Sequence, residues 1–553
     1  MRVAVEGCCH GELDKIYETL AEAVRQGGEP VDLLLCCGDF QAVRNESDLL
    51  CMAVPPKYRH MQDFHRYYSG EKQAPVLTVF IGGNHEASNH LQELPYGGWV
   101  APNIYYMGYA GVLCVGGIRI AGLSGIYKGH DYHKGHFECP PYSQDCLRSA
   151  YHVRSLEVYR LMQLSTPPDV FLSHDWPLGV TVGSGVAGLL RRKPFFTQEV
   201  EGGRLGSPPA GALLRKLHPS YWFSAHLHVK YAAIVQHQLE EGQTSPQVTK
   251  FLALDKCLPR REFLQVLELG PSLNSPPKLE YDDEWLAIMQ ATDHLTCASP
   301  HNQLPPDSVV KICADDLSRV RDLLSGDLAI PTSFSPTVPF YSPKNIEGGK
   351  IKPPVPIPSP QTATYCRRLG LTDVYILAAA RAGRGFAEAS NSSLIVNLSS
   401  ADISGNSSLN PDEILLDDDD TDGDGSAADE IDGICLTDTS DSALNVLRSP
   451  MPLHNSTPSE VFSSFLSPAP SRSPSFLDDS AQSNNAFTSC GSPVSRDLDE
   501  TEDLMESEEP DQTKSSAELG GSGGKRVGVS DECSGERKIK RRNRDIYASQ
   551  DCD

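Results

Sequence analysis

Five short runs of mainly apolar residues in the first 230 residues are each followed by polar residues of the kinds that bind metals. The runs are 2–6, 31–36, 76–81, 169–172 and 221–224. The polar residues that follow them are Cys8, His10, Asp39, Asn84, His85, His174, His226 and His228. Such runs are typical of buried strands in parallel sheets, and layered α/β folds bind ligands beyond the carboxyl ends of those strands. The pattern therefore predicts an α/β fold with one site where several strands end.

The rest of 1–270 is consistent with the same fold class. Further strands are expected at 118–123, 231–235, 250–254 and 262–267, and a helix is expected at 12–25. Beyond residue 270, short helices are expected at 281–292 and 306–324, between Pro-rich connections. The chain therefore has one large α/β region and a smaller region after it.

The formal charge of −25 is concentrated at one end of the chain. Residues 401–553 hold 33 of the 73 acidic and 12 of the 48 basic residues, a net charge of −21, which leaves −4 for 1–400. A nearly neutral body does not exclude an anionic substrate. From about 385 the chain is rich in Ser, Asp, Asn, Gly and Pro, which bury too little apolar surface to offset chain entropy. Residues 385–553 are therefore predicted to be a disordered acidic tail.

Sixteen cysteines in a chain without a secretory signal indicate reduced thiols, some of them metal ligands, rather than disulfides. No apolar run is long enough to span a bilayer, so we expect an intracellular protein without membrane contact. A basic cluster at 537–544 has the composition of a nuclear-localisation signal or of a nonspecific anion patch. The expected location is the nucleus, with shuttling to the cytoplasm allowed.

Taken one at a time, the residues at the strand ends have structural explanations. Asn84 suits a turn, Asp39 suits a helix cap, and a lone His174 is more often structural than catalytic. His226 and His228 would place both rings on one face if they lay on a strand. Together, a thiolate, several imidazoles, an amide oxygen and a carboxylate able to bridge are the ligands of a two-metal centre. A structural zinc site is the alternative, but such sites are usually closed, four-coordinate and rich in cysteine.

The stretch 124–154 differs in composition from the rest of the first region. It is rich in Tyr, His and Lys and is broken by glycines and by Pro140-Pro141. An irregular loop of this length is uncommon in a compact domain unless it has a function. Interleaved aromatic and cationic side chains suit RNA binding, although a solvated loop with packed tyrosines explains the composition equally well. The candidate RNA contacts are Tyr127, Lys128, His130, Tyr132 and Lys134.

The motif series resembles the calcineurin-like metallophosphoesterases. The segments Cys8-x-His10, Gly38-Asp39, Gly83-Asn84-His85-Glu86, His174 and His226-x-His228 follow that family's order D-x-H, G-D-x-x-D, G-N-H-[DE], H and G-H-x-H. Cys8, Ala42 and Ala225 replace the first Asp, the second Asp and the last Gly of this pattern. With cysteine at the first position, the segments around these motifs resemble the RNA lariat debranching enzymes over roughly 1–350, including a lariat-recognition loop at 124–154.

This resemblance implies a two-sheet metallophosphoesterase sandwich flanked by helices in 1–270. It further implies a small appended domain with a Pro-rich linker in 271–384, followed by the tail in 385–553. Two metal sites are implied, one formed by Cys8, His10, Asp39 and His228, and the other by Asp39, Asn84, His174 and His226, with Asp39 bridging. His85 would act as an acid or charge stabiliser near the scissile phosphate.

The activity implied by the resemblance is hydrolysis of the 2′-5′ phosphodiester at the branch point of an excised intron lariat, which linearises the RNA for turnover. Two divalent ions, Fe²⁺, Zn²⁺ or Mn²⁺, would be the cofactors, and a thiolate at Cys8 favours Zn²⁺ or Fe²⁺ over Mg²⁺. Branched RNA would be the substrate, with splicing or intron-turnover factors as further partners. The alternatives are a metallophosphoesterase acting on another phosphodiester or on a phosphoprotein, and an RNA-binding scaffold without turnover.

Overall fold

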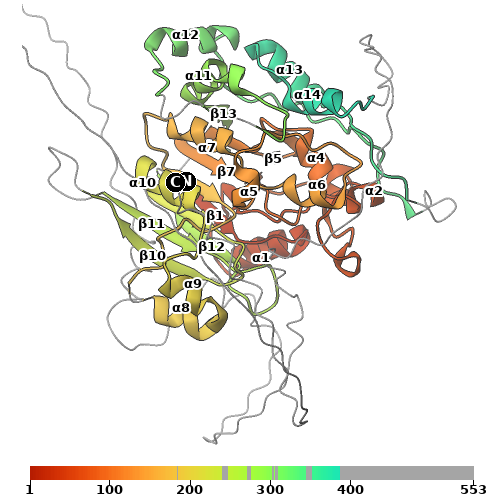
Figure 1. The fold of residues 1–553 in the computed structure, drawn as a ribbon. Helices are drawn as coiled ribbons and strands as arrows, with labels where there is room; N and C mark the ends of the chain where they lie inside the picture. The colour runs from red at the N-terminus through yellow and green to blue at the C-terminus, as the bar shows by residue number, and fades with distance from the viewer. Residues whose placement is uncertain are drawn as a thin grey trace, which may run out of the picture. The chain divides into compact units, whose positions relative to one another are not determined.

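The computed structural model describes residues 1–385, except 184, 239–246, 271–275, 302–303, 305–308 and 344–350. The predicted disordered tail therefore lies outside the described residues apart from residue 385, and so does the basic cluster at 537–544. Among the described helices, none is both long enough and apolar enough to cross a bilayer. Two β-sheets with helices packed against them make up most of the described chain (Figure 1).

The first sheet has six strands in the order β12-β1-β2-β3-β5-β4. These strands are β1 Arg2–Glu6, β2 Leu33–Cys36, β3 Leu77–Phe80, β4 Gly98–Ala101, β5 Ile104–Tyr106 and β12 Leu264–Glu268. Strands β1, β2, β3 and β5 run parallel to one another, and β12 and β4 are antiparallel edge strands. Because β1, β2 and β3 are parallel neighbours, the loops that follow them leave the sheet at the same edge.

The second sheet has seven strands in the order β10-β11-β9-β8-β7-β6-β13. They are β6 Ala110–Val115, β7 Ile118–Leu123, β8 Val170–Ser173, β9 Tyr221–Ser224, β10 Tyr231–Gln236, β11 Val248–Ala253 and β13 Leu279–Tyr281. Strands β7, β8, β9 and β11 are parallel, whereas β10, β6 and β13 pair in the antiparallel sense. The loops after β8 and β9 therefore also leave their sheet together.

The side chains alternate along the strands and so divide the core into layers. In β1, Val3 and Val5 join the cluster between the two sheets, whereas Ala4 joins the cluster on the outer face. In β8, Leu172 faces the other sheet and Phe171 faces the helices. Helices, two packed sheets and helices again form a sandwich, which confirms the predicted fold class.

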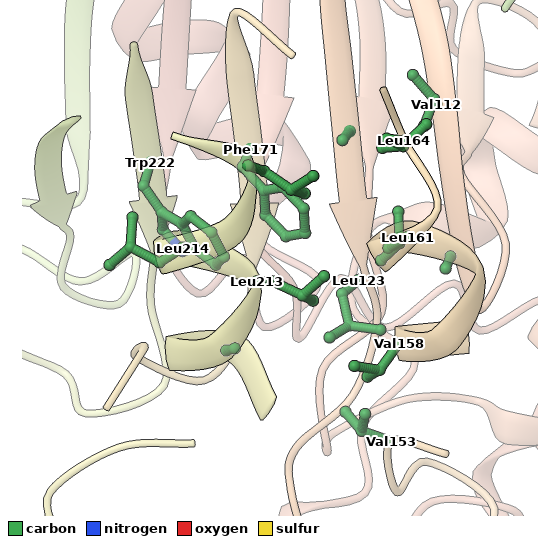
Figure 2. Close-up of a cluster of buried hydrophobic side chains, with 14 of the residues drawn as sticks. Val112, Leu123, Val153, Val158, Leu161, Leu164, Phe171, Leu213, Leu214 and Trp222 are labelled. Carbon is green, nitrogen blue, oxygen red and sulfur yellow. The ribbon is translucent and has the colours of Figure 1, made fainter. Parts of the chain in front are cut away.

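The helices contribute the apolar side chains that cover the outer faces of both sheets. Helices α1 Leu13–Arg25 and α3 Phe64–Tyr68 pack on the first sheet, and α7 Ser155–Met162, α10 Pro208–Leu217 and α11 Asp283–Ala291 pack on the second. On the second sheet, the rings of Phe171 and Trp222 stack with centroids 4.0 Å apart. They belong to the same buried cluster as Leu213 of α10 and Leu161 of α7 (Figure 2).

The structure differs from the sequence expectations in several places, among them 98–115 and 124–154. Strands β4, β5 and β6 were not predicted, because the short strands and connections in 98–115 contain too few residues to show a clear alternation of apolar and polar side chains. The stretch 124–154 is not one irregular loop, since it contains α5 Gly129–Tyr132 and α6 Gln144–Ser149. Ser143 caps α6 by accepting a hydrogen bond from the Cys146 backbone N–H, which is a signal the sequence carries.

The region after β12 packs on the sandwich through both its sheet and its helices. Strand β13 extends the second sheet beside β6, and Trp285 and Ile288 of α11 join the helix-covered cluster of that sheet. The expected helix at 306–324 is observed as α12 Ala314–Leu323, and α13 Pro360–Leu369 and α14 Val374–Arg381 follow it. Thr362 of α13 donates a hydrogen bond to the Glu93 carbonyl at 2.6 Å, which ties α13 to the first sheet's connections.

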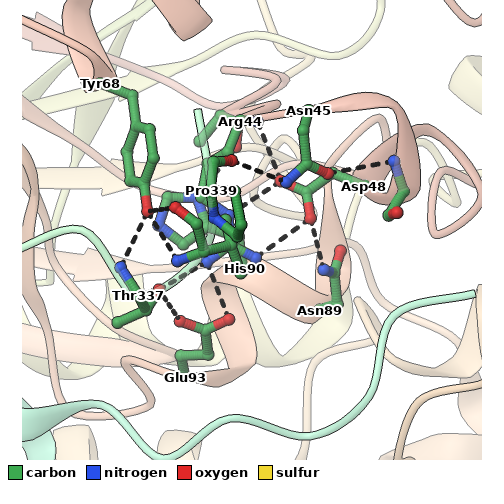
Figure 3. A network of polar contacts seen from close by, with 12 residues as sticks. Arg44, Asn45, Asp48, Tyr68, Asn89, His90, Glu93, Thr337 and Pro339 are labelled. Atoms are coloured by element: carbon green, nitrogen blue, oxygen red, sulfur yellow. Dashed lines mark hydrogen bonds and ion pairs between the residues drawn. The ribbon is translucent and has the colours of Figure 1, made fainter. Parts of the chain in front are cut away.

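A buried polar network around Arg44 holds residues 337–339 against the loops of the first sheet (Figure 3). Arg44 Nε donates to Asp48 Oδ2 at 2.8 Å, and Arg44 Nη1 donates to Glu93 Oε1 at 2.8 Å. Thr337 Oγ1 donates to Glu93 Oε2 at 2.7 Å. The side chains of Arg44, Asp48 and Glu93 are at most 4% exposed. One buried cation therefore holds two buried carboxyl groups together.

Replacing Arg44 by Met is expected to destabilise the protein by about 3–5 kcal/mol, because it leaves Asp48 and Glu93 buried without their cation. Arg25→Met is the matched control, since Arg25 pairs with Glu22 on an exposed helix face, where an ion pair adds little to stability. Thermal unfolding of the two variants measures the difference. Equal midpoints for both would contradict this account of the network.

Candidate metal centre

The polar residues named from the sequence lie in loops that follow five strands, and those loops meet. Cys8 and His10 follow β1, Asp39 follows β2, Asn84 and His85 follow β3, His174 follows β8, and His226 and His228 follow β9. Backbone hydrogen bonds join neighbouring loops: the His10 N–H donates to the Asp39 carbonyl at 2.6 Å, and the Ala225 N–H donates to the His174 carbonyl at 3.1 Å. The parallel strand order thus brings residues far apart in the sequence to one place.

The first group of donor atoms consists of Cys8, His10, Asp39 and His228, whose ligand atoms all lie within 4.8 Å of one another. His10 Nε2 lies 3.3 Å from His228 Nε2 and 3.7 Å from Asp39 Oδ2. The Cys8 sulfur accepts a hydrogen bond from the His226 backbone N–H at 3.1 Å. A thiol, two imidazoles and a carboxylate that face one point form a donor set suited to a single transition-metal ion.

The second group lies on the other side of the Asp39 carboxylate. His174 Nε2 is 3.2 Å from Asp39 Oδ1 and 3.2 Å from the Asn84 side-chain oxygen. The ring of His226 lies beside that of His174, with centroids 5.0 Å apart. Asp39 therefore turns one oxygen toward His10 and the other toward His174, as a carboxylate that bridges two cations must do.

Four of these residues have a left-handed backbone. The φ angles of His10, Asp39, His226 and His228 are 46°, 49°, 64° and 49°. Such conformations cost of order 1–3 kcal/mol each and cluster at active sites, where the surrounding structure enforces them. His226 and His228 follow the run 221–224 as expected and belong to the connection between β9 and β10, so the one-face arrangement of residues on a strand does not apply to them. Backbone turns, rather than strand alternation, bring their rings to the site.

Two glycines allow the loops to approach one another. A Cβ added at Gly38 would lie 2.3 Å from His174 Nδ1, and one added at Gly83 would lie 2.2 Å from Asp39 Oδ1. Gly38 also has a φ of +109°, which side chains rarely tolerate. The glycines of the G-D and G-N-H motifs are therefore required by the close packing of His174 and Asp39.

Glu86 is a functional residue to which the sequence analysis gave no role. Its Oε1 accepts hydrogen bonds from the N–H groups of Phe40 and Gly83, at 2.8 and 2.9 Å, and its Oε2 accepts one from Gln41 N–H at 2.9 Å. Burial, together with the charge of Asp39, raises the pKa of Glu86 to about 7. Glu86 thus joins the loop that carries Asp39 to the loop that carries Asn84. The one sequence feature that pointed to a role for Glu86 was its position in the G-N-H-[DE] motif.

Gln41 was also missed. Its side-chain amide lies 3.3 Å from His10 Nδ1, on the side of the ring opposite to His228 and Asp39. When Nε2 of a histidine binds a metal, Nδ1 carries a proton and donates it to an acceptor that fixes the ring. The Gln41 atom placed at 3.3 Å is Nε2, and turning the amide over puts its oxygen there, where it would accept from Nδ1–H. In the sequence, a single Gln after Gly-Asp-Phe does not indicate a residue that orients a metal ligand.

The electrostatics of the centre favour cations. Burial acts to raise the pKa of the Asp39 carboxyl, but the charges of His174 and His85 outweigh it and hold that pKa well below its usual range. Burial lowers the pKa of His226 to about 3, with the charge of His174 adding to the effect. Burial, followed by the charge of Asp39, raises the pKa of the Cys8 thiol. Burial acts to lower the pKa of His174, but the charge of Asp39 outweighs it and raises that pKa. A neutral imidazole at His226, an ionised carboxylate and a thiol that needs a cation to ionise fit metal binding, and a cation would take the place of the proton on His174.

His85 lies at the rim of the centre rather than inside it. Its side chain is 20% exposed, whereas that of Asp39 is 1% exposed. Its Nδ1 is 3.8 Å from Asp39 Oδ2 and 3.5 Å from His10 Nδ1, and its backbone N–H donates to Asp39 Oδ1 at 2.8 Å. A solvent-accessible imidazole next to the donor atoms can reach a bound substrate.

The predicted RNA contacts lie in a segment that is fixed by Asp131. The Asp131 carboxylate accepts from Lys134 Nζ at 2.6 Å and lies 3.1 Å from His130 Nε2. Tyr127 and Tyr132 pack edge to face with centroids 5.5 Å apart, and Lys128 is buried. These contacts hold the segment in a defined conformation. The RNA-binding role of its side chains stays a prediction.

Tyr127 connects this segment to the second group. Its backbone N–H donates to Asp175 Oδ2 at 3.2 Å, and Asp175 follows His174 in the chain. The segment 124–154 therefore borders the His174 side of the centre.

Replacing Gln41 by Ala is expected to weaken divalent-cation binding at the first group by about tenfold or more, because His10 loses the acceptor that orients its ring. Gln41→Glu should retain the affinity, since a carboxylate also accepts from Nδ1–H. Glu71→Gln on an exposed turn is the control. Titration of the metal-free protein with Co²⁺, followed by absorption, measures the affinity, and an unchanged value for Gln41→Ala would contradict the assigned role.

Comparisons with known proteins agree with this geometry. The family model "Calcineurin-like phosphoesterase" matches residues 1–230, and "Lariat debranching enzyme, C-terminal domain" matches 246–374. The chain is 54% identical to the lariat debranching enzymes of Danio rerio and Homo sapiens, over 76% and 75% of this chain and 77% and 79% of those proteins. It is 46% identical to that of Gallus gallus, over 100% of this chain and 99% of the relative. This chain belongs to the lariat debranching enzyme family of calcineurin-like phosphoesterases.

Proposed function

We propose that this chain is a metal-dependent phosphodiesterase that hydrolyses the 2′-5′ phosphodiester at the branch point of excised intron lariat RNA. The observation that carries the proposal is the Asp39 carboxylate, which stands between two groups of donor side chains in a member of this family. The reaction breaks the bond from phosphorus to the 2′ oxygen and leaves linear RNA with a 2′-hydroxyl and a 5′-phosphate. This function accounts for both the donor set and the family membership.

The donor groups are proposed to hold two divalent cations. Cys8, His10, Asp39 and His228 would hold one, and Asp39, Asn84, His174 and His226 would hold the other. When bound, two such ions supply Lewis acidity that activates water and stabilises charge on the phosphate. Fe²⁺, Zn²⁺ and Mn²⁺ are the proposed ions, and the soft sulfur of Cys8 favours Zn²⁺ or Fe²⁺ at the first site over Mg²⁺.

His85 is proposed to protonate the 2′ oxygen as it leaves. Imidazole is suited to this task near neutral pH, and the His85 side chain is the partly exposed one beside Asp39. The hydrogen bond from its backbone N–H to Asp39 Oδ1 keeps the ring next to the donor groups. The two functions, ion holding and proton donation, thus fall on different side chains of one loop, Asn84 and His85.

Two alternatives to the debranching function follow from the sequence. A metallophosphoesterase acting on another phosphodiester or on a phosphoprotein would use the same donors and differ only in the surfaces that recognise the substrate. A scaffold that binds RNA without turnover would need neither His85 nor two cation sites. The second family model, at 246–374, favours the debranching activity over both.

Further proposals concern the location and the partners of the enzyme. We propose that it acts in the nucleus, where introns are excised, and that splicing or intron-turnover factors deliver its substrate. The basic cluster 537–544 supports nuclear import through its composition.

The activity is tested with the metal-loaded enzyme and a synthetic RNA that carries one 2′-5′ branch, beside a linear 3′-5′ RNA of the same composition. Cleavage of the branch alone is expected. His85→Ala should lower kcat by about 10²–10⁴-fold, because a general acid contributes about that much, and should leave cation binding in place. Turnover of a phosphopeptide but not of branched RNA would support the first alternative, and binding without any turnover would support the scaffold.

Nuclear import is tested with a fluorescent fusion of the full chain. Replacing Lys538, Lys540, Arg541 and Arg542 by Ala should move the fusion from the nucleus to the cytoplasm. Lys525→Ala with Arg526→Ala is the control for charge loss in the same tail. Nuclear accumulation that does not change would assign import to another signal.

A further inference from the structure

A cationic and aromatic surface lies beside the connection that carries His228. We call it the α8 rim, defined as Arg191, Arg192, Lys193 and Phe195, from α8 Val186–Arg192 and the short helix Pro194–Phe196 that follows. Phe195 is 55% exposed, the Arg192 side chain is 46% exposed, and Arg191 is also exposed. A single exposed ring is not unusual by itself, but this one stands beside three consecutive cations.

The rim is held in a fixed position by the core beneath it. Leu189 of α8 and Phe196, the neighbour of Phe195, are buried in the cluster that covers the second sheet. The Phe195 and Phe196 rings lie with centroids 4.5 Å apart, and Lys193 Nζ lies 5.7 Å from the centre of the Phe195 ring. The burial of Phe196 therefore forces Phe195 and the adjacent cations outward, and the ring is not free to collapse into the core.

Contacts connect the rim to the first group of donors. Arg192 Nη2 donates to the Lys230 carbonyl at 2.8 Å, and Lys230 lies two residues after His228. Two residues span at most about 7–8 Å between Cα atoms, so the rim begins within about one nucleotide of the centre. In Figure 1, α8 lies next to β10, the strand that starts just after Lys230.

A second contact joins the rim to the Cys8 loop. The Asp255 carbonyl accepts from the Cys8 N–H at 3.3 Å. The Asp255 N–H in turn donates to the Glu262 carbonyl at 3.1 Å, and Glu262 Oε2 lies 3.9 Å from Arg192 Nη1. The rim thus continues to the Cys8 and His228 edge of the centre.

The charge of this surface is opposite to that of the chain. The rim has three cations, Arg191, Arg192 and Lys193, and the nearby carboxylates are Glu262 and, on the helix α9 Thr197–Glu201, Glu199 and Glu201. Three consecutive cations concentrate positive charge on the rim itself, whereas residues 1–400 have a net charge of −4. A polyanion is therefore the chemical partner that the rim fits.

We propose that the α8 rim binds a single-stranded RNA segment that leaves the branch point, with Phe195 stacking on an unpaired base and the rim cations contacting the phosphates on either side. An exposed ring between cations is the arrangement by which single strands are held without sequence preference. At a branch point three strands diverge, and the rim lies beside the connection that carries His228, whereas the segment 124–154 borders the loop that carries His174. The rim thus determines how strongly long substrates bind, a role that rests on the proposed debranching function.

The test compares two substrates with the metal-loaded full chain. One is a minimal branched RNA with a single nucleotide on each arm, and the other carries single-stranded arms of ten nucleotides. Phe195→Ala should raise KM for the long substrate about tenfold, leave its kcat unchanged, and leave the minimal substrate unaffected, because stacking is lost only where an arm is present. Phe195→Trp should restore the wild-type KM.

The cations are tested by the salt dependence of binding to the long substrate. Arg191→Ala with Arg192→Ala should reduce the slope of log Kd against log salt by about 1.4, since each phosphate contact of a single strand contributes about 0.7. The matched controls are Arg319→Ala with Arg321→Ala, two arginines of α12 whose side chains are 55% exposed, and Phe340→Ala, an exposed ring that packs on Tyr68.

The outcomes separate the two proposals. A wild-type enzyme that leaves both branched substrates intact would overturn the debranching function and, with it, the rim. If the wild-type enzyme cleaves both substrates and the rim variants behave like the control variants on the long one, only the proposal for the α8 rim is overturned. Equal effects of Phe195→Ala on both substrates would likewise assign the ring to local structure and not to RNA.

Discussion

The buried carboxylate of Asp39 is the constraint on which the rest of the site depends. A charged group with 1% exposure needs compensating charge or hydrogen bonds on every side, and here these come from His10, His85 and His174. The loops after five strands must therefore meet around one anion. Gly38 and Gly83 carry no side chain at the points where those loops touch, and Glu86 ties two of them together through backbone N–H groups.

The sandwich supplies the geometry that this arrangement needs. Parallel strands in both sheets direct their loops to a common edge, and the cluster between the sheets fixes the distance from β1–β3 to β8 and β9. The region after β12 adds rigidity from outside, through β13 in the second sheet and the Arg44 network in the first. Substrate recognition is then left to surfaces around the edge, on the Tyr127 side and on the Phe195 side.

The sequence was most informative about the site where residues of metal-binding types directly follow a predicted strand. The eight residues of the centre could be named because each follows an apolar run, and the strands β1, β7 and β9 were placed with their observed bounds. Gln41, Glu86 and Phe195 could not be assigned roles, because their roles depend on which loops become neighbours in space. The left-handed turns at His226 and His228 were missed for the same reason, since strand periodicity says nothing about a connection that bends back.

The most direct test of the central claim is a crystal structure of the metal-loaded protein with anomalous scattering measured at the edges of the bound metals. The account predicts two ions per chain, with one oxygen of Asp39 on each, the Cys8 sulfur on the ion shared with His10 and His228, and His85 on neither. A single ion held without Asp39, or two ions that Asp39 does not bridge, would contradict it.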